Sequence, residues 1–504
     1  MEDSDKPKLV KPNLKGEWKN IFLLLLLYML QGIPMGLSFA IPLILQNQKV
    51  SYTDQALFST SAWPFSLKLL WAPIVDTWFI KKIGRRKSWL LPVQFLLGVI
   101  LIYTAANFND WMYKEKPNIQ LIVIVFFFAN FLAATQDIAV DGWALTMLKK
   151  ENVGYASTCN SSGQAVGILL GYVLPILLDS ESFGNNYLRS TPAKGGVVSM
   201  KSSIYFWGIA FMIITSLVGL FEKENQNSSK IGENEPEHSI IQTYSLLWRI
   251  IKLPNIRILI FALLTYRIAF AATDYVTSLK LLEAGLPKDN FLIVSIALYP
   301  FKIILPLVVT KYTSGPKPMS ALLNAFPFRL FSGLFTVLLV YYTPKFITQG
   351  NYGGSFIYYI LFGLIMLYQE LLMYYMFVAI MGFFSRISDP QFGGTYMTLL
   401  NTISNLGLTW TATASLGMID WLTINTCTCR SSLKDCDSSD KTCAVSVDGY
   451  YLETVICTII GMIWYIIYNN KLRKMQVVSK ENWSVKMKKS SPENVDKIFT
   501  INLE

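Results

Sequence analysis

The sequence predicts an all-α polytopic membrane protein with twelve transmembrane helices in two six-helix bundles. Of its 504 residues, 52% are hydrophobic and 15% are charged, whereas charged residues make up about a quarter of a soluble domain. The apolar residues gather in runs of about 20, the length that a helix needs to cross a bilayer core of about 30 Å. A long hydrophilic connector separates these runs into two equal sets.

Twelve apolar runs are candidate transmembrane helices. In the first half they cover residues 21–45, 54–78, 88–106, 119–148, 155–178 and 203–221. In the second half they cover residues 255–280, 290–310, 322–343, 354–384, 393–419 and 449–469. The first run follows a hydrophilic segment and lacks a small-residue cleavage site, so we interpret it as a retained helix.

The runs also define the expected domains. These are an N-terminal segment at 1–20, an N-terminal bundle at 21–221, a connector at 222–253, a C-terminal bundle at 254–469 with a Cys-rich loop at 420–448, and a basic tail at 470–504. Lysines and arginines accumulate in the short loops that twelve spans place on one side, and this side is predicted to be the cytosol. Both termini, the connector and the tail are therefore expected to be cytosolic.

Composition also excludes several classes of function. The net charge of +11 could suggest nucleic-acid binding, but the basic residues lie in loops between apolar runs and do not form one basic surface. The only histidine, His238, lies in the hydrophilic connector. A membrane-embedded acyltransferase would need a base within the spans, so we expect no enzyme, no cofactor and no metal-dependent catalysis.

The two halves resemble each other at an offset of roughly 236 to 240 residues, as a parallel repeat of two bundles would. Trp63, Pro64 and Phe65 with Lys68 recur as Tyr299, Pro300 and Phe301 with Lys302. The repeat supports the two-bundle architecture, although glycine and proline matches also occur by chance.

The loop after the second run has the features of a gating loop. Asp76 ends the run, and Gly84 and Arg85 begin a basic cluster. An acid, a glycine turn and a basic cluster resemble the loop signature of the major facilitator superfamily, in which Asp and Arg latch the two bundles. A plain positive-inside anchor loop is the alternative.

The fourth run carries two carboxylates, Asp137 and Asp141, within the segment from Ala134 to Leu145. Residues four apart share one helix face, and acids inside a membrane normally face a bundle interior, a partner or a water-filled path. They either line a transport path or pair with Lys68 to fix the N-terminal bundle.

With this run, the resemblance becomes specific. The run, the twelve-helix layout, the loop from Asp76 to Lys87 and the segment from Lys280 to Lys288 resemble the acetyl-coenzyme A (acetyl-CoA) transporter family of the endoplasmic reticulum membrane. More distantly they resemble bacterial muropeptide permeases. The likeness covers about residues 15–470. It implies a major facilitator fold and transport of acetyl-CoA from the cytosol into the lumen, where it supplies acetyl groups.

Acetyl-CoA carries phosphate groups, so its path needs cations inside the membrane. The candidate substrate-binding residues are Arg267, Lys302, Lys68 and Arg329. The acids Asp137, Asp141, Glu370 and Asp274 lie in the same spans. The formal charges nearly cancel, so some of these residues are expected to form structural ion pairs.

The loop between the last two runs holds Cys427, Cys429, Cys436 and Cys443. It lies opposite the basic loops, and four cysteines in an exposed segment suggest disulfides in an oxidising lumen, with three possible connectivities. A small metal site is the alternative.

No ATP-binding P-loop is present, so transport is expected to run by exchange against coenzyme A (CoA), with proton coupling through Asp137 and Asp141 as the alternative. The alternative substrate is another organic anion carried with protons, as by a muropeptide permease. A non-transporting receptor would leave the charges in the spans unexplained. The resemblance also allows a homodimer, although we identify no clear G-x-x-x-G face.

Overall fold

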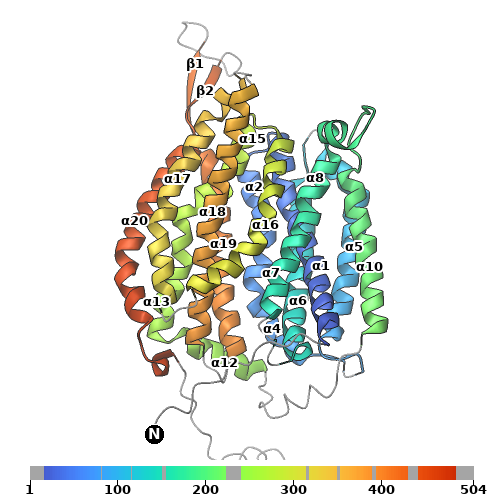
Figure 1. Cartoon of the computed structure of the whole chain (residues 1–504), viewed down its shortest axis with the longest axis vertical. Helices are drawn as coiled ribbons and strands as arrows, with labels where there is room; N and C mark the ends of the chain where they lie inside the picture. Colours follow the sequence, from blue (N-terminus) through green and yellow to red (C-terminus); the bar gives the residue numbers. More distant parts are fainter. Residues whose placement is uncertain are drawn as a thin grey trace, which may run out of the picture.

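We describe a computed structural model of the chain (Figure 1). The described residues are 16–80, 82–114, 116–149, 152, 155–222, 240–313, 317–348, 352–388, 393–429 and 441–483. Nearly all of them are helical, as their apolar composition requires, because a helix satisfies its own backbone hydrogen bonds inside a bilayer.

The first half contains long helices and two interrupted spans. Its elements are α1 (Trp18–Asn47), α2 (Tyr52–Ser59), η1 (Thr60–Ala62), α3 (Trp63–Leu67), η2 (Lys68–Leu70), α4 (Ala72–Thr77), α5 (Lys87–Met112), α6 (Ile119–Met147), α7 (Tyr155–Ile168), η4 (Leu169–Val173), α8 (Leu174–Asp179), α9 (Glu181–Phe183), η5 (Gly184–Leu188) and α10 (Met200–Phe221). The second span, from α2 to α4, changes helix type at Pro64 and Pro73, because proline removes a helical hydrogen bond.

The second half follows the same plan. Its elements are α12 (Ile240–Ile251), α13 (Pro254–Thr265), η7 (Tyr266–Phe270), α14 (Ala271–Tyr275), α15 (Thr277–Glu283), α16 (Lys288–Thr313), α17 (Pro318–Thr348), α18 (Tyr352–Ile387), α19 (Gly393–Leu422), β1 (Ile424–Cys429), β2 (Lys441–Val447), α20 (Gly449–Met475) and η8 (Lys480–Trp483). The seventh span, from α13 to α15, is interrupted by the 3₁₀ segment η7.

Nine spans in the described part of the chain are long and apolar enough to cross a membrane by length and composition. The three other predicted spans are the interrupted second span, α16 and α19. Charged residues lower the hydropathy of α16, and α19 is rich in threonine, serine and asparagine. Together these helices form twelve spans in two bundles, which confirms the predicted fold class.

Two elements outside the spans distinguish the two ends of the molecule. Antiparallel strands β1 and β2 form a hairpin beyond α19 and α20, and α12 lies at the opposite end, close to α4 (Figure 1). We call these the hairpin end and the α12 end. The sequence analysis anticipated neither the hairpin nor a helix in the connector.

Small residues let α1 and α7 cross with their backbones in contact. A Cβ added at Gly32 or Gly36 of α1 would overlap the backbone of the fifth span, and one added at Gly163 or Gly167 would overlap α1. The statement that no G-x-x-x-G face is present is therefore wrong: Gly163, Gly167 and Gly171 form one. It is used within the chain, as small residues often are in membrane helices.

The two bundles meet along a small number of helices. The second span, through α2 and α3, packs against α19, and α16 packs against α7 and η4. The hairpin end adds contacts between α1 and α15. Residues on these helices therefore lie at or beside the seam between the bundles.

Candidate transport site

A buried ion pair lies inside the N-terminal bundle. Lys68, at the start of η2, pairs with Asp137 of α6, and the two side chains are 13% and 6% exposed. The other carboxylate oxygen of Asp137 accepts a hydrogen bond from Nε2 of Gln31 at 2.7 Å. Asp137 of the fourth span therefore contacts residues of the first and second spans.

Asp141 lies one turn further along α6 and has neutral partners. Its Oδ1 accepts hydrogen bonds from the Tyr28 hydroxyl at 2.7 Å and from Nδ2 of Asn160 at 3.3 Å. Among the described residues it forms no ion pair. The two acids that share a helix face thus have different partners.

The C-terminal bundle contains a corresponding pair. Nζ of Lys302 on α16 lies 2.6 Å from Oε1 of Glu370 on α18, and the side chains are 30% and 19% exposed. The Lys302 ammonium also lies 5.4 Å from the centre of the Tyr299 ring. Lys68 and Asp137 join the second and fourth spans, and Lys302 and Glu370 join the eighth and tenth. The two pairs therefore occupy equivalent helices of the repeat.

Two arginines of the C-terminal bundle differ in their partners. Arg329 on α17 is 3% exposed and donates to Oδ2 of Asp274 at 2.7 Å. Arg267 in η7 is 7% exposed, and its guanidinium lies 5.2 Å from the centre of the Tyr266 ring. Its Nε has no hydrogen-bond partner and no carboxylate contacts it in the described part of the chain. Three of the four candidate cations are thus paired with a carboxylate, whereas Arg267 pairs with none among the described residues.

The loop at the α12 end is organised around Asp76. Arg86 forms an ion pair with the Asp76 carboxylate, whereas Nε of Arg85 donates to the Asp76 backbone oxygen at 2.6 Å. Gly84 has a φ of +107°, a conformation that favours glycine. The sequence analysis named Arg85 as the basic partner and missed Arg86, because neighbouring arginines cannot be told apart without the turn geometry.

Gly142, which directly follows Asp141, makes room for this ion pair. A Cβ at Gly142 would overlap the Arg86 guanidinium. We expect Gly142→Ala to displace Arg86 from Asp76 and to destabilise the protein by up to about 1 kcal/mol, because the overlapping atoms are the far end of a flexible side chain and the ion pair that is lost is partly exposed. Thermal unfolding of the purified protein in detergent measures this effect. Gly363→Ala is the control, since its Cβ would meet Val294 at an ordinary 3.7 Å; equal melting temperatures for both variants would contradict the prediction.

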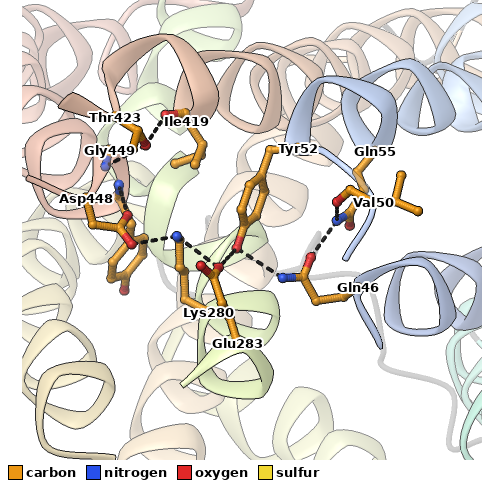
Figure 2. Close-up of polar contacts among 11 residues, drawn as sticks. Gln46, Val50, Tyr52, Gln55, Lys280, Glu283, Ile419, Thr423, Asp448 and Gly449 are labelled. Atoms are coloured by element: carbon orange, nitrogen blue, oxygen red, sulfur yellow. Dashed lines mark hydrogen bonds and ion pairs between the residues drawn. The ribbon is translucent and has the colours of Figure 1, made fainter. Parts of the chain in front are cut away.

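At the hairpin end, polar side chains connect the two bundles (Figure 2). The Tyr52 hydroxyl at the start of α2 donates to Oε2 of Glu283 at 2.6 Å. The same carboxylate oxygen lies 2.9 Å from Nζ of Lys280, which lies 2.6 Å from Oδ2 of Asp448. Gln46 extends the chain of contacts within the N-terminal bundle. Lys280 is 6% exposed. Its buried ammonium lies beside the carboxylates of Glu283 and Asp448, and so supports the contact that Glu283 makes with Tyr52.

Further contacts continue along this seam. The backbone nitrogen and hydroxyl of Thr53 both donate to Asp420 of α19, at 2.8 and 2.9 Å. The Ser59 hydroxyl lies 2.7 Å from the Thr413 hydroxyl, and the Ser180 hydroxyl donates to Asp289 at 2.5 Å. The bundles are therefore closed against each other at the hairpin end. We call the contacts of Tyr52, Glu283, Lys280 and Asp448 the hairpin-end gate.

One buried acid was missed by the sequence analysis. Glu453 on α20 is 2% exposed, and its Oε2 has no hydrogen-bond partner within the described residues. It lies inside the last predicted span, so a systematic search for acids in the spans would have found it. By contrast, Tyr52 and Glu283 could be recognised only from the tertiary contact.

The predicted cysteine cluster is partly described. Cys427 of β1 and Cys443 of β2 are direct partners in the hairpin register, and Cys429 is opposite Lys441. Cys436 lies outside the described residues. Cys159 and Cys457 are buried in helices and are free thiols.

Comparison with known proteins identifies the family. The family model for acetyl-coenzyme A transporter 1 matches residues 20–238, 223–330 and 320–485. The chain belongs to the acetyl-coenzyme A transporter family. This result confirms the resemblance that the sequence motifs indicated.

Relatives and solved structures agree with this assignment. An uncharacterized protein of Schizosaccharomyces pombe is 34% identical over 451 residues, covering 87% of this chain and 83% of that protein. The anhydromuropeptide permease of Escherichia coli is 27% identical over 163 residues, 32% of each chain. A crystal structure of a D-xylose–proton symporter superposes with a TM-score of 0.56 at 11% identity, covering 93% of this chain and 99% of that one; this likeness shows the fold alone. The acetyl-coenzyme A transporter family member described here is thus a membrane transporter with the major facilitator fold, and its neighbours are transporters, not enzymes.

Proposed function

We propose that the protein carries acetyl-CoA from the cytosol into the lumen of the endoplasmic reticulum, in exchange for CoA. The family and the fold support transport in general. The observation that points to a polyanionic solute is Arg267, the candidate cation in the spans that no described carboxylate neutralises. A guanidinium suits phosphate because its planar fork donates two parallel hydrogen bonds.

Lys302 is the second proposed ligand. It lies on α16, a helix that packs against the opposite bundle, and it is the more exposed of the two repeat-related lysines. A phosphate group arriving at the seam could take the place of Glu370 beside the ammonium. Lys68, Arg329 and their acids are proposed to hold the bundles in shape, because these pairs are more deeply buried.

The direction of transport rests on topology. We propose that the α12 end faces the cytosol. Arg85, Arg86 and Lys87, which are described members of the basic loops, lie between the end of α4 and the first turn of α5 at this end. Short basic loops stay in the cytosol. The hairpin end then faces the lumen. In the described conformation the lumenal side of the seam is closed by the hairpin-end gate.

Uptake of radiolabelled acetyl-CoA into liposomes that hold the purified protein tests the proposal. We expect uptake, and a severalfold faster rate when CoA is preloaded inside. Arg267→Ala should lower the rate, whereas Arg257→Ala, an exposed arginine of α13, should not. No uptake by folded protein in either condition would exclude acetyl-CoA, and uptake that ignores the preload would exclude exchange.

A second candidate is proton-coupled transport of another organic anion. Glu453 favours it, because acids inside membrane spans mark proton relays in transporters, and this one has no cation beside it in the described residues. An imposed pH gradient would then drive uptake in the absence of CoA. If such a gradient has no effect and preloaded CoA does, exchange is the mechanism.

A further inference from the structure

The hairpin between α19 and α20 is exposed at those residues whose burial is described. It projects beyond the helices (Figure 1), and Ile424, Val445 and Val447 on its strands are 53%, 61% and 41% exposed. A single two-stranded hairpin in water is marginally stable at best. The register nevertheless pairs five consecutive positions without interruption, from Asn425–Val445 to Cys429–Lys441. Among the strand residues whose burial is described, core packing therefore contributes little to this ladder.

The register places two cysteines opposite each other, where a covalent bond between the strands can form. Cys427 and Cys443 are direct partners, and opposed residues in an antiparallel pair have Cα atoms about 4.5–5.5 Å apart. Disulfides bridge Cα atoms at about 4.4–6.8 Å. Cys429, two residues further along β1, is opposite Lys441 and so has no cysteine opposite it. We propose that Cys427 and Cys443 form a cross-strand disulfide.

Formation of the bond requires an oxidant. A thiol oxidoreductase that carries a disulfide fits this role: the thiolate of one cysteine attacks the oxidant's disulfide and forms a mixed disulfide, and the second thiolate then displaces the oxidant. Two thiols lose two protons and two electrons, and the oxidant leaves as a dithiol. Such oxidants work in oxidising compartments. The proposed disulfide therefore assigns the hairpin end to an oxidising compartment, and this assignment does not depend on which solute is transported.

The disulfide also supports the gate. Asp448 follows β2 directly, accepts from Lys280 and caps α20 by accepting from the Tyr450 backbone nitrogen at 2.9 Å. A bond across the hairpin fixes the strand that leads into this residue. The proposed disulfide is therefore linked, through β2 and Asp448, to the buried ammonium of Lys280 at the seam.

Peptide mapping tests the proposal on the full-length protein, purified from eukaryotic membranes with free thiols alkylated before digestion. Trypsin cleaves after Arg430, Lys434 and Lys441 and so separates Cys427, Cys436 and Cys443 onto different peptides. Without reduction, we expect the peptide 442–471, which holds Cys443 and the buried free thiol Cys457, to be joined to the Cys427 peptide, and Cys443→Ser to abolish the link. Cys427→Ser should abolish this link completely, and Cys429→Ser, the matched control on the same peptide, should retain it.

Three results would overturn the proposal. The first is a link to Cys443 that persists in Cys427→Ser, since it would assign the partner to Cys429 or Cys436. The second is full alkylation of Cys427 and Cys443 in the unreduced wild type. The third is one equivalent of zinc in the purified protein, lost in Cys427→Ser. The mapping needs no transport assay, so its outcome is independent of whether acetyl-CoA is the solute.

Discussion

Lys302→Ala is expected to lower the initial rate of acetyl-CoA uptake by about tenfold or more, whereas Glu370→Gln is expected to retain uptake. Nζ of Lys302 and Oε1 of Glu370 are 2.6 Å apart. If phosphate replaces the carboxylate, the lysine is required in the loaded state and the acid is not. A hydrogen bond to a charged group contributes about 1.5–3 kcal/mol, and about 1.4 kcal/mol corresponds to a factor of ten in an equilibrium constant.

The double variant Lys302→Ala with Glu370→Ala separates binding from folding. Lys302→Ala alone leaves a mostly buried carboxylate without its cation, which is strongly destabilising in itself. Removing both groups relieves that cost but leaves the substrate without its ligand. The double variant should therefore recover melting temperature but not uptake. Recovery of both would show that Lys302 has only a structural role.

Glu283→Ala is expected to open the hairpin end about tenfold more often. Glu283 accepts from Tyr52 across the seam and shares Lys280 with Asp448. Its loss removes a charge-assisted contact between the bundles; because the Glu283 side chain is 47% exposed, the contribution lies at the lower end of about 1.5–3 kcal/mol. Because Lys280 keeps Asp448, the C-terminal bundle should remain folded. Tyr52→Phe should act in the same direction, since it removes the same hydrogen bond between the bundles.

Alkylation of a cysteine placed at Ser59 measures this opening. Ser59 is beside Thr413 at the seam, and the tryptic peptide between Lys49 and Lys68 contains no native cysteine. The labelling rate by a membrane-impermeant reagent should rise in Glu283→Ala. Asp54→Asn is the control, because the Asp54 carboxylate accepts a hydrogen bond from the Ser51 hydroxyl of the same bundle and not from the other bundle. An unchanged rate in Glu283→Ala would mean that the gate is closed by other contacts.

Hydropathy and loop charge predicted the helices because both depend on local composition. The observed α5, α6 and α10 begin and end close to the predicted runs. Which charges pair could not be predicted in the same way. The four-residue spacing places Asp137 and Asp141 on one face, but only the packing of η2 against α6 decides that Lys68 contacts Asp137.

The remaining features depend on contacts between distant segments. The gate joins Tyr52 to Glu283, which are 231 positions apart, and no local pattern indicates such a contact. The hairpin was missed because its residues are polar and follow a long helix, so a loop was the natural expectation. Glu453 is different, since it was visible within an apolar run and was overlooked among the other acids.

The glycine crossing of α1 and α7 has a mechanical consequence for alternating access. Where backbones touch directly, at Gly32 and Gly167, no side chain can change rotamer to absorb a displacement. The two helices are therefore expected to move together as one rigid body. Bending during the transport cycle is then left to segments outside this crossing where the helical hydrogen-bond pattern already changes, at η2 and η7, and two of the candidate cations, Lys68 and Arg267, are located in these segments.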